Sequence, residues 1–354
     1  MAGKVTRVGN KNQGGRGAGV LHVHRVSEGW FGSFSSCTMF GEISSFSREC
    51  EKPLEILREK KPTFVCAPMV RYSKLAFRNL VRLYGCDIAF TPMIMSDSFV
   101  RSEKARDNEF TTNTADHPLI VQFAANNPSD FANASELVSR WCQGVDLNCG
   151  CPQRWAQQEG IGACLIHKPQ LVYDIVRQTR NRIPDNDFTV SVKIRVHKDV
   201  RETVELCRRA EAAGVAFVTV HGRTAQQRRE PVQLDAIRQV ADALRVPVLA
   251  NGDIRSREDA LATADATGVN GVMAAQGLLN NPALFSGAPS TPPSCVRDWV
   301  RLATDAGTPF ACFHHHLIYM LERLMPRVLR RSFNVLPSHA AVLQFLRHEL
   351  ELDV

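Results

Sequence analysis

From residue 62 onward the sequence repeats one pattern: a short apolar run, a turn, and a stretch with apolar residues at helical spacing. The apolar runs are Phe64–Ala67, Asp87–Thr91, Leu119–Phe123, Val145–Asn148, Val190–Ile194, Phe217–His221, Val246–Ala250 and Gly271–Ala274. The helical stretches include Ser73–Tyr84, Ser129–Trp141, Pro169–Asn181, Val200–Ala213, Leu234–Leu244 and Arg257–Ala266. Runs that are apolar nearly throughout are typical of strands buried on both faces, as in parallel sheets covered by helices. Eight such units predict an α/β fold, a TIM (β/α)8 barrel.

The alternative fold is an open, doubly wound parallel sheet, which is built from the same units. Such a sheet usually has a glycine-rich fingerprint directly after its first strand. Here the first predicted strand is followed by Ala67-Pro68-Met69-Val70, which contains no glycine. The sequence therefore favours the barrel.

The barrel is predicted to span residues 61–286, with distinct segments on either side. Residues 1–60 are an N-terminal extension, predicted to be disordered in part because residues 1–27 hold five Lys or Arg, six Gly and no Asp or Glu. Residues 287–293 suit neither a strand nor a helix and are predicted to be a linker. Beyond it, apolar residues at helical spacing predict a small helical domain over residues 294–354.

The composition predicts a soluble protein with a large core. Hydrophobic residues make up 44% of the chain, and no apolar run approaches the roughly 20 residues that a membrane helix needs. The N-terminus lacks the apolar segment of a secretory signal, so we expect a cytoplasmic protein. A mitochondrial transit peptide is the alternative for the basic start. We expect a monomer without an obligate protein partner.

The cysteines and histidines predict no bound metal. Eleven cysteines, an odd number without framework spacing, indicate free thiols. Cys149 and Cys151 form a C-x-C pair, but no matching second pair accompanies it, which argues against structural zinc. The run His314-His315-His316 does not form a metal site either, because adjacent residues point in different directions on a helix.

The run Asn148-Cys149-Gly150-Cys151-Pro152 places a thiol on a Gly/Pro turn directly after a predicted strand. Active sites of TIM barrels lie at this end of the strands. From the residues alone, such a cysteine can be a nucleophile, a metal ligand, a proton donor or a small core residue.

Polar residues follow other predicted strands in the same way. They are Pro68 with Met69, Gln122, Asn148 with Cys151, Lys193 with Arg195, His221 with Arg223, Asn251-Gly252-Asp253 and Ala275-Gln276-Gly277. Each has an ordinary structural explanation when taken alone, such as a satisfied backbone group or a packed imidazole. Because the carboxyl ends of the strands meet at one end of a barrel, we expect one site.

Glycines after the last two strands indicate a bound phosphate, since TIM barrels hold phosphate in those loops with backbone N–H groups. Gly252 and Gly277 would allow the close approach. A phosphate there, with Lys193 and His221 reaching inward, suits a phosphorylated cofactor such as FMN, whose reduced anion a nearby cation stabilises. The alternative for Lys193 is a Schiff-base amine activated by the neighbouring charge of Arg195.

Six segments, in order, resemble the motifs of tRNA-dihydrouridine synthases. They are Ala67-Pro68-Met69, Val121-Gln122-Phe123, Asp146-Leu147-Asn148-Cys149-Gly150-Cys151-Pro152, Val192-Lys193-Ile194-Arg195, Val220-His221-Gly222-Arg223-Thr224 and Asn251-Gly252-Asp253-Ile254. The resemblance runs over residues 62–285 and continues more weakly into the helical tail. The stretch 149–156, together with Cys312-Phe313-His314, resembles the eukaryotic branch that acts on D-loop uridines 20a and 20b.

The resemblance implies an enzyme that reduces tRNA uridines to 5,6-dihydrouridine with FMN, which NADPH or NADH reduces beforehand. Cys151 would be the acid that protonates C5 while a hydride goes to C6, and Asn148 and Arg195 would face the uracil or its phosphate. The implied FMN contacts are Pro68, Met69, Val70, Gln122, Lys193, His221, Asn251, Gly252, Asp253, Ala275, Gln276 and Gly277. The family usually has arginine at position 276, so Gln276 removes one charge-assisted contact to the phosphate.

Arginines are the expected tRNA contacts, and the formal net charge of +7 suits a polyanionic partner without requiring one. They are Arg223, Arg228 and Arg229 near the sixth strand, and Arg323, Arg327, Arg330 and Arg331 in the tail. The last three fall at i, i+3 and i+4, on one face of a helix predicted to start after Pro326. A solvated basic face is the alternative.

Two other functions stay open at this point. A free-pyrimidine or ene reductase would use the same flavin barrel without affinity for RNA. A catalytically silent RNA-binding protein would keep the barrel without the flavin, which Gln276 makes conceivable. A yellow colour of the purified protein separates the silent protein from the other two.

Overall fold

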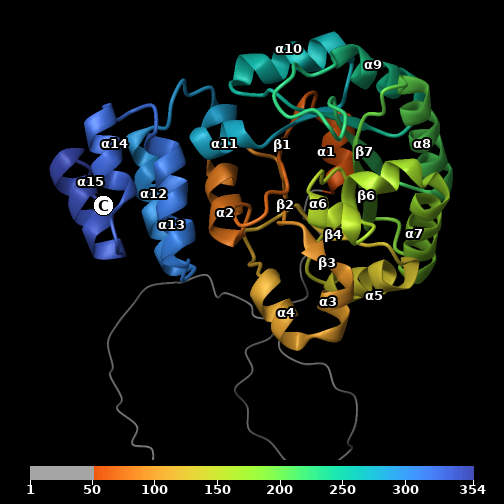
Figure 1. Cartoon of the computed structure of the whole chain (residues 1–354), viewed down its shortest axis with the longest axis horizontal. Coiled ribbons are helices and arrows are strands. Elements are labelled where there is room, and N and C mark those ends of the chain that lie inside the picture. Colours follow the sequence, from red (N-terminus) through yellow and green to blue (C-terminus); the bar gives the residue numbers. More distant parts are fainter. Residues whose placement is uncertain (1–51) are drawn as a thin grey trace, which may run out of the picture.

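The computed structural model describes residues 52–354, in which a closed parallel barrel is ringed by helices and followed by a helical unit (Figure 1). The barrel strands are β1 (Thr63–Cys66), β2 (Ile88–Phe90), β4 (Leu119–Ala124), β5 (Gly144–Cys149), β6 (Thr189–Arg195), β7 (Phe217–His221), β8 (Val248–Asn251) and β9 (Gly271–Ala274). Each pairs in parallel with the next in this order, and β9 returns to pair with β1. The predicted TIM barrel and its eight strands are therefore confirmed.

One further strand, β3 (Ile94–Met95), was not expected from the sequence. It pairs in parallel with the end of β4, through Ile94 with Phe123 and Met95 with Ala124. Pro92 separates β3 from β2, and a proline cannot donate to the strand ladder, so the two strands stay distinct. β3 thus pairs only with the carboxyl end of β4.

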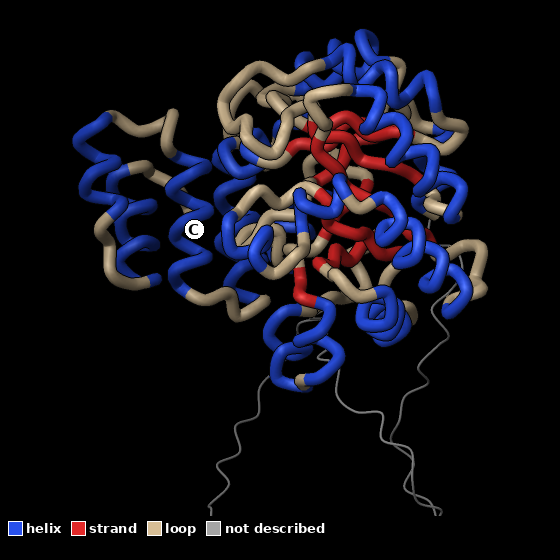
Figure 2. The backbone as a smooth tube through the Cα atoms, turned by 45° about the vertical axis from the view of Figure 1, so that its right-hand side comes forward, coloured by secondary structure: helices blue, strands red, loops and turns tan. Residues whose placement is uncertain are grey.

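Helices form the outer layer around the strands (Figure 2). Those of the barrel are α1 (Pro53–Glu59), α2 (Leu75–Leu83), α3 (Ser96–Arg101), α4 (Glu103–Glu109), α5 (Pro128–Val138), α6 (Arg154–Gln158), α7 (Pro169–Arg182), α8 (Val200–Ala213), α9 (Leu234–Ala243), α10 (Arg257–Thr267) and α11 (Gln276–Asn280). The 3-10 helices are η1 (Gly162–His167) and η2 (Leu284–Ser286), and the C-terminal unit holds α12 (Pro293–Asp305), α13 (Phe310–Leu321), α14 (Arg327–Asn334) and α15 (His339–Glu349).

Helix ends follow the local sequence closely where strong caps exist. Helix α8 has the bounds predicted for it, because the Asp199 side chain accepts the Arg201 N–H at its start. At its end, Gly214 adopts a left-handed conformation with φ of 99°, which a glycine tolerates without strain. These caps explain why the prediction was accurate there.

The end of the predicted N-terminal extension is an ordered helix on the barrel. Helix α1 lies within residues 1–60, and its Ile56 and Leu57 are buried against barrel residues that include Phe90 and Phe217. Burying these side chains removes apolar surface from water and attaches α1 to the barrel. The predicted boundary at residue 60 is therefore too late for this helix, while residues 1–51 lie outside the described part.

The C-terminal helical unit packs on the barrel through α2, α12 and α13, which lie side by side in Figure 1. His316 on α13 is at the centre of this interface. Its ring stacks on Phe77 with centroids 4.5 Å apart and lies 4.4 Å from that of Trp299. Its Nε2–H donates to the carbonyl oxygen of Tyr72, 3.2 Å away. The helical unit thus contacts the β1–α2 loop directly.

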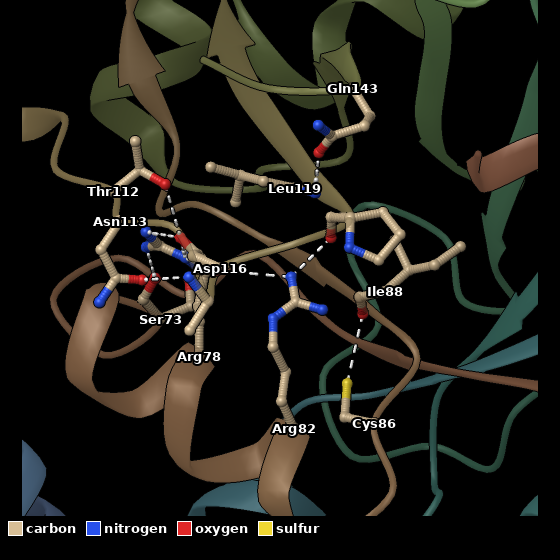
Figure 3. A network of polar contacts seen from close by, with 12 residues as sticks. Ser73, Arg78, Arg82, Cys86, Ile88, Thr112, Asn113, Asp116, Leu119 and Gln143 are labelled. Carbon is tan, nitrogen blue, oxygen red and sulfur yellow. Dashed lines mark hydrogen bonds and ion pairs between the residues drawn. The ribbon is translucent and has the colours of Figure 1, made fainter. Parts of the chain in front are cut away.

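A buried polar network holds the other side of the same loop (Figure 3). Asp116 accepts hydrogen bonds from Arg78 and Arg82 of α2, and Arg78 Nη1 donates to the carbonyl oxygen of Ser73. Burial alone would raise the pKa of Asp116, but the two guanidinium groups hold it below its ordinary value. Ser73 Oγ in turn accepts the Met69 N–H, so the network reaches a predicted cofactor contact.

The nine cysteines in the described part of the chain are all free, in line with the prediction of reduced thiols. Between Lys52 and the C-terminus, none of the helices combines the length and apolar composition that crossing a membrane requires.

We predict that acid weakens the barrel–helix interface through His316. Burial lowers the pKa of this imidazole from 6.5 to about 3. Its Nδ1 has no hydrogen-bond partner among the described residues, so a proton added there would find no acceptor. Because the folded-state pKa is depressed, the stabilising contribution of the neutral ring is complete above pH 6.5 and is lost as pH falls towards 3. The free energy of unfolding of His316→Phe, measured across this range, should fall less steeply than that of the wild type. Parallel curves would contradict the prediction.

Candidate active site

A cavity of about 730 Å³ lies at the carboxyl ends of β7, β8 and β9. Several predicted cofactor residues line it: His221, Asn251, Gly252, Asp253, Ala275, Gln276 and Gly277. Its outer wall comes from the 287–293 segment, from α13 and from the residues that follow α13, through Thr291, Met320 and Arg323 among others. The cavity therefore lies between the barrel mouth and the helical unit.

Two glycines allow the backbone to form the inner wall of this cavity. Gly252 has φ of 125°, and a Cβ there would come within 2.5 Å of Val232. A Cβ on Gly277 would lie 2.2 Å from the carbonyl oxygen of Ile254. Any side chain at these positions would force the loops apart, so the glycines permit a close approach that suits a phosphate group.

Lys193 is the buried cation beside the cavity. Its side chain on β6 is only 9% exposed, and Nζ donates to Asn251 Oδ1 over 2.8 Å. Asn251 Nδ2 donates to the carbonyl oxygen of Met273, which fixes the orientation of the amide. Burial lowers the pKa of Lys193 to about 8, and Asp146 opposes that decrease. The amine therefore remains mostly charged at neutral pH and keeps two protons for other acceptors.

His221 is held in its neutral form. Burial, together with the charges of Lys193, Arg195 and Arg223, lowers its pKa to about 2. Arg223 Nη1 lies 3.2 Å from His221 Nε2 and, as a permanent donor, gives it a hydrogen bond. Arg223 is itself paired with Asp253, with Nη2 2.6 Å from Oδ2. The proton of the neutral ring is therefore on Nδ1, which can act as a donor.

The turn that bears Cys151 is fixed by backbone and side-chain contacts. Asn148 Oδ1 accepts the N–H groups of Gly150 and Cys151, over 3.1 and 2.9 Å. Arg195 Nε donates to the Gly150 carbonyl oxygen, and the Cys151 carbonyl accepts the Ala163 N–H. The Cys151 side chain remains partly exposed. It is therefore the thiol of this turn that a substrate can reach.

Cys149, two residues earlier, is in a different environment. It is fully buried in the core of the barrel wall, and burial raises the pKa of its thiol well above the ordinary value. A buried, protonated thiol of this kind behaves as a small apolar side chain. The two cysteines of the C-x-C pair are thus not equivalent.

Other predicted cofactor contacts do not line the cavity. Pro68 and Met69 are half-buried on the β1–α2 loop, while the Val70 side chain is 52% exposed. Gln122 is buried and donates from Nε2 to Asp146 Oδ2. Their roles towards a cofactor stay predictions.

The arginines predicted to bind tRNA fall into two groups. Arg223, Arg228, Arg229 and Arg323 line the main cavity. Arg327, Arg330 and Arg331 instead line a separate hollow of about 210 Å³ with Ile318, Glu322 and Asn334. The predicted helix after Pro326 is confirmed as α14. The three arginines of α14 thus share one face, apart from the barrel mouth.

Sequence reasoning missed several residues of this site. Asp146 was noted only as part of a motif, although its carboxylate is buried among the predicted site residues. Thr291 and its neighbours were assigned to a linker, because their Pro/Ser/Thr composition gives no sign of a cavity wall. Arg255 also lines the cavity, directly after the Asn251–Ile254 motif. The position of Arg255 beside that motif was the one available signal.

One group of described residues brings together atoms that can ligate a metal: His167, His197 and Glu202. Both ring nitrogens of His197 already have partners, the Thr203 hydroxyl and the Ile166 carbonyl oxygen. Metal binding would have to break one of these bonds, so we propose no metal there.

Comparison with known proteins places the chain in a family. The model of the family described as Dihydrouridine synthase (Dus) matches residues 65–350. A mouse protein named tRNA-dihydrouridine(20a/20b) synthase (NAD(P)+)-like is 54% identical over 83% of this chain and 91% of its own length. The Schizosaccharomyces pombe tRNA-dihydrouridine(20a/20b) synthase (NAD(P)+) is 43% identical over 83% of this chain and 90% of its own. Among solved structures, old yellow enzyme from Trypanosoma cruzi aligns with a TM-score of 0.48 and 9% identity, over 63% of this chain and 86% of that one.

The family match spans most of the chain, and it includes both the barrel and the helical unit that together enclose the cavity. This protein belongs to the dihydrouridine synthase family.

Proposed function

We propose that this protein reduces uridine in tRNA to 5,6-dihydrouridine, with FMN as its cofactor and NADPH or NADH as the reductant. Family membership and the names of the relatives support this activity. The observation that carries the proposal is the pairing of two neighbouring strand ends. Asn148, which fixes the Cys151 turn, lies directly opposite the buried cation Lys193 in the β5–β6 register. The proposed proton donor would thus follow directly on the strand that pairs with the strand of the proposed flavin-stabilising cation.

The residues at the barrel mouth fit FMN. Gly252 and Gly277 would let backbone N–H groups approach its phosphate, and the arginine-rich cavity wall favours an anion. Lys193 and the Nδ1–H of His221 would donate to the ring system, where a cation stabilises the reduced form. When bound and reduced, the flavin supplies the hydride for C6 of the uracil.

Cys151 would supply the proton for C5 as a general acid. This role uses the thiol and leaves a thiolate after each turnover. Arg195 holds this turn through its hydrogen bond to the Gly150 carbonyl oxygen, so it would position the thiol for that step.

The tRNA would be held mainly through its phosphates, with the target uridine drawn out of the D-loop into the cavity. Four arginines of the cavity wall and three on α14 are the proposed contacts. The names of the relatives favour uridines 20a and 20b as targets. A cytoplasmic location and a monomeric state stay predictions.

Flavin uptake tests the cofactor. The purified protein should be yellow, or should take up added FMN, with a flavin absorbance spectrum. A colourless protein that does not bind FMN would favour a silent RNA-binding function. A flavoprotein that reduces free pyrimidines but does not bind tRNA would favour the second alternative.

We predict that Gln276→Arg raises FMN affinity. Gln276 lines the cavity and donates only to Asn280, over 3.0 Å. An added guanidinium next to Gly277 would form a charge-assisted bond with the phosphate, which corresponds to a gain of roughly tenfold. Gln276→Met is the neutral control and should bring no gain. Equal dissociation constants for all three proteins, measured by flavin fluorescence, would place the phosphate elsewhere.

A further inference from the structure

Asp146 is a buried carboxylate that has no role in the proposed chemistry. Its side chain on β5 is 0% exposed, and no arginine or lysine lies within hydrogen-bonding distance of it among the described residues. Ser191 Oγ donates to Oδ1 over 2.7 Å, and Gln122 Nε2 donates to Oδ2 over 2.8 Å. The charge of Lys193 acts on Asp146 from a greater distance. Keeping such a carboxylate in the barrel core costs free energy that an apolar residue would avoid.

The hydrogen bonds of Asp146 have a forced direction. An ionised carboxylate only accepts, so the Gln122 amide must turn its nitrogen towards Asp146. Its Oε1 then faces Asn148 and accepts from Asn148 Nδ2 over 2.8 Å. That bond turns Asn148 Oδ1 to the turn, where it accepts the Gly150 and Cys151 N–H groups. Each amide passes on the direction set by the one before it.

We propose that Asp146 is a positioning residue that fixes the Cys151 turn through the amides of Gln122 and Asn148. This chain of three side chains is called the amide relay below. The reason for fixing the turn rests on the proposed function of Cys151, but the test below does not depend on that function. Without an acceptor-only group at its inner end, only the N–H groups of the turn would hold the relay in this direction. In the reversed direction, Asn148 would present its NH₂ group to the backbone donors of the turn and lose both bonds.

The protonation state of Asp146 agrees with this assignment, which itself rests on the hydrogen bonds. Burial raises the pKa of Asp146 to about 6, while the bonds from Ser191 and Gln122 and the charge of Lys193 act in the opposite direction. The carboxylate is therefore ionised at neutral pH, where it can only accept. A group kept solely to fill space would need no such charge.

A swap of the relay's two ends is the test. In Asn148→Asp, carboxylates stand on both sides of Gln122, which can donate to only one of them. In Asp146→Asn/Asn148→Asp, Gln122 can donate to position 148 and accept from position 146, so the relay is consistent again. Amide hydrogen exchange at Gly150 and Cys151 reports the turn in flavin-free protein without tRNA. We expect roughly tenfold faster exchange in Asn148→Asp and near wild-type exchange in the double variant.

Ser191→Ala is the matched control, because it removes a bond to Asp146 Oδ1 but leaves the acceptor-only carboxylate. Exchange at the turn should then stay within about twofold of wild type. If Asn148→Asp does not fold alone, folding of the double variant is the rescue and supports the relay. Additive effects of the two substitutions on amide exchange would overturn the inference. It would also be overturned if the double variant does not fold while Asp146→Asn shows wild-type amide exchange at the turn. None of these measurements depends on catalysis. A failure of the amide relay can therefore be distinguished from a failure of the proposed function.

Discussion

Replacing Cys151 with alanine should slow dihydrouridine formation by on the order of 10²–10⁴-fold, the usual contribution of a positioned general acid. The turn that holds Cys151 is fixed by backbone contacts that do not involve its thiol, so fold and ligand binding should persist. Reduction of the flavin by NADPH should keep its wild-type rate. Rates of both half-reactions, followed separately by flavin absorbance in a stopped-flow instrument, give the comparison.

Cys149→Ala is the matched control, because Cys149 lies on the same turn but is fully buried. Its loss should alter stability through packing and leave the chemical step close to wild type. Equal slowing of the two variants would show that the turn's packing, rather than the Cys151 proton, limits the rate. An unchanged rate in Cys151→Ala would assign the proton to another donor.

The second large effect concerns α14. Replacing Arg327, Arg330 and Arg331 together with alanine should weaken tRNA binding and flatten its salt dependence, because each lost phosphate contact removes a share of counterion release. The slope of log affinity against log salt should decrease by roughly 0.7–0.9 per contact. Folding should be unaffected, since none of the three side chains belongs to the core.

The control removes the same charge from the opposite side of the molecule. Arg201, Arg208 and Arg209 are exposed on α8, which lies across the barrel from the helical unit (Figure 1). Replacing these three with alanine should change neither the affinity nor the salt slope appreciably. If both triple variants behave alike across a salt series, the α14 face is merely solvated and the tRNA is held elsewhere.

The barrel could be predicted because its strands carry their signal locally. A run such as Leu119–Phe123 is apolar at every position except Gln122, which is typical of a parallel strand covered by helices. Once the strands are placed, topology alone brings their carboxyl ends together. That is why His221, Asn251 and Gly277, distant in sequence, could be assigned to one site before any contact was known.

The features that were missed depend on contacts between distant segments. No local pattern marks α1 as part of the barrel, because Ile56 and Leu57 have meaning only against Phe90 and Phe217. The 287–293 segment has the composition of a linker and becomes a cavity wall only when α13 packs beside it. The same holds for Asp146, whose apolar neighbours in sequence conceal that it meets Gln122 on the adjacent strand.

The most direct test of the central claim is a single-turnover reaction. Enzyme whose FMN has been reduced is mixed, without oxygen, with tRNA that lacks dihydrouridine. We predict that the flavin is re-oxidised as one dihydrouridine forms per flavin, at position 20a or 20b, and that free uridine monophosphate does not re-oxidise it. Reduced flavin that persists in the presence of tRNA, or that reacts equally with the free nucleotide, would contradict the proposed function.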